Sequence, residues 1–215
     1  MIRLHKGVCP AILENNAAAW TAKLLAAFAS GSVPTKAERG RYNEATIKAA
    51  LVQETHGKCA YCESKLLHIA YGDIEHIMPK APNPNHWFDW NNLTLACDRC
   101  NTNKGEHTDV LDPYEVDPSE HLWFVGVFVF AKPGSDVGEL TERRLDLNRD
   151  DLLERRKERL GRLRILLDRI RRIQNDEVRE ALTGDVLEEV SDDKEYAAMA
   201  REVLRSARAN GILPA

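Results

Sequence analysis

The chain has 215 residues, of which 43% are hydrophobic and 30% are charged. A chain of this length can bury a hydrophobic core, so its folding requires no disulfide framework. The formal net charge is −4, and the total charge therefore gives no support to nucleic-acid binding; a basic surface would have to be local.

The first residues carry no long apolar run and no small-residue cleavage pattern, so no signal peptide is expected. No stretch approaches the ~20 apolar residues that a transmembrane helix needs. We therefore expect a cytoplasmic protein with reduced thiols and no membrane segment.

Helical patterns dominate the first part of the chain. Residues 10–28 are rich in Ala and Leu and predict a helix, whereas the glycines and proline of residues 31–42 predict a loop. Helical periodicity returns over residues 43–56, and Gly57 is expected as its C-terminal cap. Short strands around residues 74–77 and a helix beginning near Cys97 or Asp98 are expected next.

The second half of the chain predicts one strand and then long helices. Residues 122–131, LWFVGVFVFA, are aromatic and β-branched and predict a buried strand, with a second strand or turn near residues 139–145. Residues 149–174 have apolar residues at three- and four-residue spacings and predict a long helix. The acidic remainder is expected to be helical.

Two Cys-x-x-Cys pairs form the strongest motif of the chain, Cys59-Ala-Tyr-Cys62 and Cys97-Asp-Arg-Cys100. Each pair can place two thiolates on one ion through a tight turn, and two pairs complete a tetrahedral zinc site. A site closed by four sulfurs has no open position, so this zinc would be structural. Redox pairs or unrelated buried thiols are the alternative, and Cys9 stands apart as a small buried residue.

Three further motifs lie in and beside the segment between the cysteine pairs: DIEHIMPK at residues 73–80, NNL at 91–93 and CDRCNTNKG at 97–105. Together they resemble the HNH nucleases of the ββα-metal superfamily over about 50 residues. The resemblance implies an α+β, predominantly helical fold. It would comprise an N-terminal helical region (1–56), an HNH module with structural zinc (57–110) and a strand plus long-helix C-terminal region (111–215) for a partner or dimer.

The resemblance also implies roles for individual residues. Glu75 would bind a catalytic divalent cation, His76 would be the general base, and Asn101 would supply the second ligand through its amide oxygen. Asn92 would fix the loop that carries His76. Lys104 follows Asn101 by three residues, so on a helix it shares roughly the same face and could contact a substrate phosphate.

Two positions depart from the pattern of many family members. Glu75 stands where aspartate is common, and it is still a hard oxygen ligand. Asn101 stands where other members carry histidine, which favours Mg²⁺ or Mn²⁺ over a catalytic zinc. Asp73 could support the metal ligands or be a solvated carboxylate.

Two other segments have open interpretations. The aromatic run at residues 86–90 could stack on bases or form the core of the module. The arginines of residues 149–174 could follow a phosphate backbone or form a solvated face with ion pairs. The apolar stripe of this helix could pack on a partner helix, including a second copy of the chain.

The segments CAYCE at residues 59–63 and LDLN at 145–148 extend the resemblance to the HNH nucleases of the Septu and retron-associated anti-phage systems. This resemblance implies a role in bacterial defence, a DNA or tRNA-like target and an ATPase partner of the ABC type. The expected function is an endonuclease that hydrolyses phosphodiester bonds, most simply in DNA. The alternative is an inactive zinc-stapled module that binds nucleic acid or serves as an adaptor.

Overall fold

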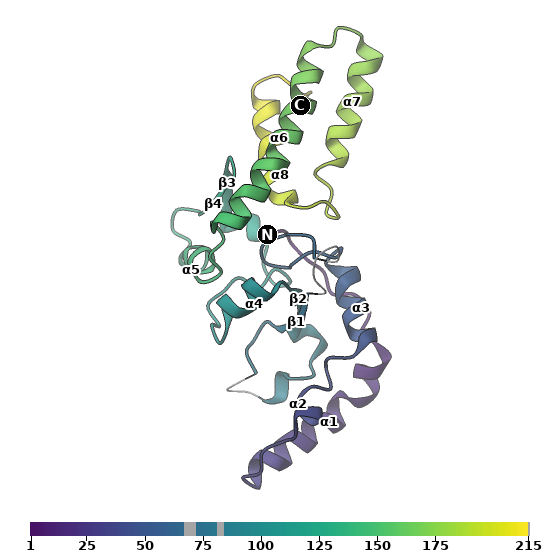
Figure 1. Ribbon diagram of the computed structural model, residues 1–215, viewed down its shortest axis with the longest axis vertical. Coiled ribbons are helices and arrows are strands. Elements are labelled where there is room, and N and C mark those ends of the chain that lie inside the picture. The colour runs from purple at the N-terminus through teal and green to yellow at the C-terminus, as the bar shows by residue number, and fades with distance from the viewer. Residues whose placement is uncertain (67–71, 81–83, 215) are drawn as a thin grey trace.

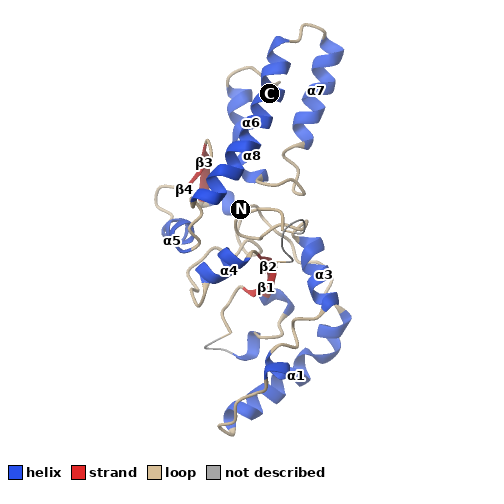
Figure 2. Cartoon of the chain, in the orientation of Figure 1, coloured by secondary structure: helices blue, strands red, loops and turns tan. Residues whose placement is uncertain are grey.

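The computed structural model describes residues 1–66, 72–80 and 84–214, and it is elongated (Figure 1). One end is formed by α1 (Ala11–Ala29) and α2 (Lys36–Arg39), and the other by α6 (Asp150–Arg172), α7 (Asp176–Glu188) and α8 (Ala197–Ala209). The described residues form two small sheets between these ends (Figure 2). The predicted α+β, predominantly helical fold is confirmed.

The N-terminal end contains one helix in a segment whose glycines and proline predicted a loop. Residues 31–42, expected as a loop, include α2, which is stabilised by a capping box. The Thr35 side chain accepts a hydrogen bond from the Glu38 N–H, and the Glu38 carboxylate accepts one from the Thr35 N–H at 2.9 Å. A Thr and a Glu three residues apart satisfy two N–H groups that a helix leaves unpaired, which allows even this short helix to form.

The next helix, α3 (Ala45–Glu54), ends two residues before the expected end at residue 56. His56 is the first left-handed residue, with φ 54°, and Gly57 follows with φ 68°. The Gly57 N–H donates to the Val52 carbonyl at 2.8 Å and the His56 N–H donates to the Gln53 carbonyl at 3.2 Å. This is a Schellman motif, and it turns the chain directly into the first cysteine pair.

The centre of the molecule has the order strand, strand, helix. Strand β1 (Asp73–His76) pairs antiparallel with β2 (Leu93–Ala96), so that Glu75 lies opposite Thr94. Helix α4 (Asp98–Lys104) is separated from β2 by Cys97 alone and packs on β1. Its N-cap is Cys97, whose sulfur accepts the Cys100 N–H. The cap and the apolar residues of β2, which are fully buried, fix α4 against the sheet.

The predicted strand over residues 122–131 is a hairpin of β3 (Leu122–Val125) and β4 (Phe128–Ala131). Its turn contains Gly126 at φ 61°, a backbone angle that favours glycine. One face is buried, and the other exposes large apolar side chains, namely those of Trp123, Val125, Phe128 and Phe130. Because apolar residues occupy both faces, the sequence has no alternation, and the prediction of one buried strand is wrong.

The strand or turn expected near residues 139–145 is also wrong, because α5 (Asp136–Arg144) covers that segment. The Ser135 hydroxyl caps this helix by accepting the Gly138 N–H at 3.1 Å. Acidic residues in the first turn and arginines in the last complement the helix dipole. These end effects stabilise a helix whose short length gives little periodic signal.

The long helix predicted over residues 149–174 is confirmed as α6. The first part of its apolar stripe, including Leu152, belongs to the main core, and the second part, including Leu167 and Ile170, packs against α7 and α8 in a separate core. Short connections bring the three helices side by side at the end of the molecule that holds residue 214 (Figure 1). Among the described residues, no helix is both long and apolar enough to span a bilayer.

Candidate zinc centre and nuclease site

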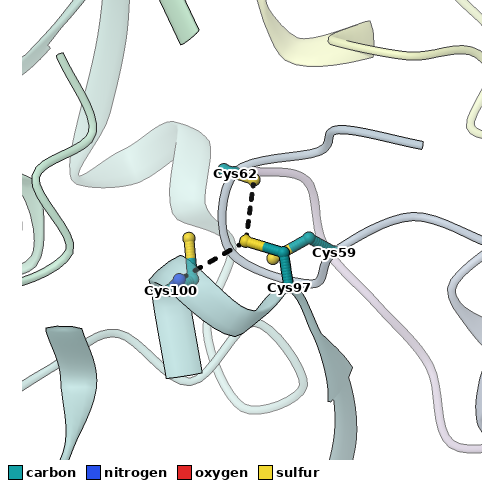
Figure 3. Close-up of side chains that lie close together, drawn as sticks. All are labelled: Cys59, Cys62, Cys97 and Cys100. Atoms are coloured by element: carbon teal, nitrogen blue, oxygen red, sulfur yellow. Dashed lines mark hydrogen bonds between the residues drawn. The ribbon is translucent and has the colours of Figure 1, made fainter. Parts of the chain in front are cut away.

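The four predicted zinc ligands lie together (Figure 3). Cys59 and Cys62 occupy a tight turn next to the bridge between residues 58 and 65, and Cys97 and Cys100 lie at the start of α4. The four sulfurs lie within 4.8 Å of one another, and those of Cys62 and Cys97 are 3.9 Å apart. Tetrahedral zinc with Zn–S bonds of ~2.3 Å places its sulfurs ~3.8 Å apart, so these ligands fit zinc.

Arg149 is a site residue that sequence reasoning assigned only to the basic helix. Its guanidinium lies 3.7 Å from the Cys100 sulfur and 3.9 Å from the Cys97 sulfur, and the residue is 7% exposed. Burial lowers the pKa of Arg149, but the Cys100 and Cys62 sulfurs outweigh this effect and raise it, so the guanidinium stays charged. Four thiolates on one zinc carry net negative charge, which Arg149 would partly offset.

The zinc turn is also held by the segment that precedes α8. The Ser64 and Tyr196 hydroxyls are 2.8 Å apart, and the Lys58 ammonium donates to the Lys194 carbonyl at 3.0 Å. More than a hundred residues separate each pair along the chain, so no local pattern predicts these contacts. They tie the cysteine turn to the C-terminal helices.

His76 ends β1 and is almost completely buried, with 3% of its surface exposed. Its Nε2 lies 3.0 Å from the Trp87 carbonyl oxygen. A carbonyl can only accept, so Nε2 carries the hydrogen, and a neutral ring keeps its lone pair on Nδ1. Burial lowers the pKa of His76 to about 4, and the ring is therefore neutral at pH 7.

Glu75 is also buried, and its partner is Lys104. The Lys104 ammonium lies 2.9 Å from the Glu75 carboxylate and donates to the His76 carbonyl at 3.0 Å. Burial raises the pKa of Glu75, and the charge of Lys104 opposes that rise. Only 2% of the Lys104 side chain is exposed. The structure therefore places Lys104 inside the module, and this position does not present it to a phosphate in solvent.

Asn101 and Asp73 form the neighbouring contact between α4 and β1. The Asn101 amide donates to the Asp73 carboxylate at 3.0 Å. Within the described part of the chain, the Asn101 amide oxygen accepts no hydrogen bond, so it is available as a ligand. Asn101 and Lys104 share one face of the helix and meet Asp73 and Glu75 on one face of the strand.

Asn92 connects the two loops that flank His76. Its side-chain oxygen accepts the Met78 N–H at 2.6 Å, and its amide donates to the Met78 carbonyl at 3.0 Å and to the His86 carbonyl at 2.9 Å. These bonds hold the chain after β1 next to the segment that carries the Trp87 carbonyl. They are the kind of contact that a loop-fixing role requires.

The aromatic run at residues 86–90 and the arginines of α6 contribute mainly to packing and ion pairs. The rings of Trp87, Phe88 and Trp90 are at most 8% exposed, a position typical of core residues. Arg156 of α6 is buried and donates to the Leu147 carbonyl at 2.8 Å, and other arginines of α6 pair with carboxylates. The described contacts thus favour ion pairing and packing for many of the α6 arginines.

Residues 59–107 match the family model of the HNH endonucleases. The chain is 34% identical over 151 residues to the Septu protein PtuB of Bacillus mycoides (strain KBAB4), covering 54% of this chain and 51% of that protein. It is 36% identical over 113 residues to the Septu protein PtuB of Bacillus thuringiensis, covering 50% of this chain and 43% of that protein. The chain thus spans about half the length of the curated relatives it matches. The segment with the four cysteines and His76 matches the HNH endonuclease family, and the chain is similar to the Septu protein PtuB.

Proposed function

We propose that the chain is a metal-dependent HNH endonuclease that hydrolyses phosphodiester bonds in nucleic acid, with DNA as the expected substrate. The state of His76 is the observation that carries this proposal. Its Nε2–H is held by the Trp87 carbonyl, which leaves the Nδ1 lone pair as the base. A neutral imidazole can accept a proton from the attacking water at pH 7.

Glu75 and Asn101 would hold a divalent cation, Mg²⁺ or Mn²⁺. A carboxylate oxygen and an amide oxygen are ligands that such hard ions accept, and the Asn101 oxygen is free of hydrogen bonds within the described chain. When bound, the cation would polarise the phosphate and stabilise the departing 3′ oxygen. The zinc of the four cysteines would stabilise the module, because four sulfurs leave no position for substrate.

The proposal is tested with purified protein, plasmid, single-stranded DNA and RNA, each with Mg²⁺, Mn²⁺ or EDTA. His76→Ala is compared with His5→Ala, which removes an exposed histidine from the N-terminal segment. We expect cleavage by the wild type and by His5→Ala, and none by His76→Ala or in EDTA. Cleavage that persists in His76→Ala, or its absence in the wild type under all conditions with its partner present, would overturn the assignment.

The ion pair between Glu75 and Lys104 favours a second candidate function, a zinc-stapled module that binds nucleic acid or a partner without cutting. In that case Lys104 would occupy the carboxylate permanently. Calorimetric titration of the zinc-loaded protein with Mn²⁺ separates the two functions. Binding that is lost in Glu75→Gln supports the nuclease, and no binding to the wild type supports the inactive module.

We further propose that the nuclease acts in bacterial anti-phage defence in the cytoplasm, with an ABC-type ATPase as partner. Similarity to the Septu protein PtuB in two Bacillus species supports this setting. The C-terminal helices would serve the partner or a second copy of the chain. Co-expression with the ATPase, followed by light scattering, tests whether the chain binds the ATPase or a second copy of itself. A mass equal to that of one free chain would contradict both kinds of assembly.

A further inference from the structure

A hollow of about 790 Å³ lies between α2 and the segment that follows β1. We call it the α2 groove, and its lining includes Lys36, Arg39, Tyr42, Lys80 and Trp87. Helix α2 forms one wall at the end of the molecule opposite α6 and α7 (Figure 1). The groove therefore depends on a helix within the segment that the sequence pattern predicted as a loop.

The described lining of the α2 groove is positively charged. Lys36, Arg39 and Lys80 supply three cations, and no Asp or Glu is among the described residues that line it. The acidic residue of α2, Glu38, faces the other side, where its carboxylate lies 3.0 Å from the Lys23 ammonium. Within the described chain, Lys36 and Arg39 are exposed and have no ion-pair partner. A protein of net charge −4 thus has a local cationic surface here.

The same groove reaches the histidine that would act as the base. The Tyr42 ring meets the His76 ring edge-on with centroids 4.5 Å apart, and the Lys80 ammonium donates to the Tyr42 hydroxyl at 2.9 Å. Trp87 supplies the carbonyl that holds His76 Nε2 at 3.0 Å. Tyr42 and Trp87 therefore contact His76, and Lys80 contacts Tyr42, so the groove adjoins the residues that enclose the proposed base.

We propose that the α2 groove binds the phosphodiester backbone of the nucleic acid on one side of the bond to be cut. This inference rests on the proposed nuclease function. Unpaired cations bind phosphates and release counterions, which gives affinity without sequence preference. An acidic polypeptide would also suit the charge, but it carries no bond of the kind that His76 is proposed to cleave.

The test removes the two free cations of α2 together, in the variant Lys36→Ala/Arg39→Ala. The matched control, Arg171→Ala/Arg172→Ala, removes the same charge from exposed positions at the end of α6. Binding of a labelled 20-base-pair DNA duplex, of the single strand and of the same sequence in RNA is measured by fluorescence anisotropy. Several salt concentrations are used without added divalent cation, and poly-glutamate is the acidic-polypeptide probe. Circular dichroism and zinc content verify that all proteins are folded.

We expect the α2 variant to reduce the slope of log K against log salt by roughly 1.4 to 1.8, because each lost phosphate contact changes it by ~0.7 to ~0.9. Affinity at low salt should fall by about tenfold or more, and the α6 control should behave as the wild type. The preferred nucleic acid among the three identifies the source of the backbone. The inference would be overturned if both variants lost affinity equally or if the α2 variant lost none. It would also be overturned if the wild type showed no salt-dependent binding or bound poly-glutamate as tightly as nucleic acid.

Cleavage of the same substrates is measured separately with Mg²⁺ or Mn²⁺. A wild type that binds through the α2 groove but never cuts, even with its partner present, contradicts the nuclease proposal alone. A wild type that cuts while the α2 variant binds normally contradicts the groove proposal alone. The two failures are therefore distinguishable.

Discussion

In the segment formed by β1, β2 and α4, charged and polar side chains lie in the interior, whereas the core shared by α6, α7 and α8 is apolar. Glu75, His76 and Lys104 are all buried, and each has a specific partner. The C-terminal core contains Leu167, Ile170 and other apolar residues. Removing one partner of a buried hydrogen bond or ion pair costs the full desolvation of the other group, whereas removing atoms from an apolar core costs stability in proportion to the atoms removed. Single substitutions should therefore destabilise the segment of β1, β2 and α4 strongly and the C-terminal helices only moderately.

The largest effect is expected from removal of a zinc ligand. Cys97→Ser should abolish stoichiometric zinc binding and unfold the module, because folding energy and metal affinity are linked and amount to about 10 kcal/mol or more in small zinc domains. The helical signal of α6 to α8 should persist in part. Zinc content, near-ultraviolet circular dichroism and limited proteolysis measure this. Cys9→Ser is the matched control, since Cys9 lies outside the cluster. A metal-free Cys97→Ser that is fully folded would contradict the structural zinc.

The second prediction concerns Lys104. Lys104→Met should destabilise the protein by about 3–5 kcal/mol, because it leaves the Glu75 carboxylate buried without its cation. Urea unfolding measures the loss, and Lys132→Met, which removes an exposed lysine, should change little. A stable Lys104→Met whose only defect is weaker substrate binding would instead support the phosphate contact that the motif suggested.

Lys104 also shows how far the sequence leads within the site. Spacing along a helix correctly predicts that Asn101 and Lys104 share a face, because helical geometry is local. It does not reveal that β1 covers this face, since that contact joins residues far apart in the chain. The two cysteine pairs were easier to interpret, because each pair makes half of the site within one turn. Arg149 had no such signal: only the folded chain brings it to the sulfurs.

Of the elements of the fold, some were predictable from the sequence and others were not. Helices with a long apolar stripe, such as α6, were found from their period. The hairpin at residues 122–131 was missed because apolar residues occupy both of its faces. Helix α5 was missed because its stability depends on its ends, although Ser135 followed by acidic residues is a recognisable start signal.

The third prediction tests the point where the two regions meet. Arg149→Met should accelerate zinc release and destabilise the protein by about 2 kcal/mol, because charge-assisted hydrogen bonds to the cysteine sulfurs are lost. A chromogenic chelator measures the release rate. Arg164→Met, an exposed change on the same helix, is the control. Unchanged zinc release in Arg149→Met would mean that the helix and the metal are energetically independent.

The fourth prediction concerns pH and a partly buried lysine beside the module. The Lys6 ammonium lies 3.0 Å from the Glu54 carboxylate, which also accepts the Tyr114 hydroxyl; Asp112 and Asp89 are the other charges near it. Burial lowers the pKa of Lys6, and Glu54 opposes this. Between the lowered pKa and 10.5, the unfolded chain binds more protons than the folded one, so this contribution to stability rises with pH.

We therefore expect the wild type to become more stable relative to Lys6→Met as the pH rises from 7 to 9.5. One proton limits the slope to about 1.4 kcal/mol per pH unit. Urea unfolding at several pH values measures the difference. If the stability of the wild type relative to Lys6→Met stayed constant or fell over this range, burial would not lower the pKa of Lys6 in the folded state.

The smallest effect is expected in the C-terminal core. Ile170→Val removes one methylene from a residue that is 1% exposed and should cost about 1 kcal/mol. Because no charged group is involved, this cost should be the same at pH 7 and 9.5, and zinc content should not change. Val178→Ala, on an exposed part of α7, is the control. If Ile170→Val instead released zinc or lost stability in a pH-dependent way, the apolar helices and the polar module would form one cooperative network, and the contrast between them would not hold.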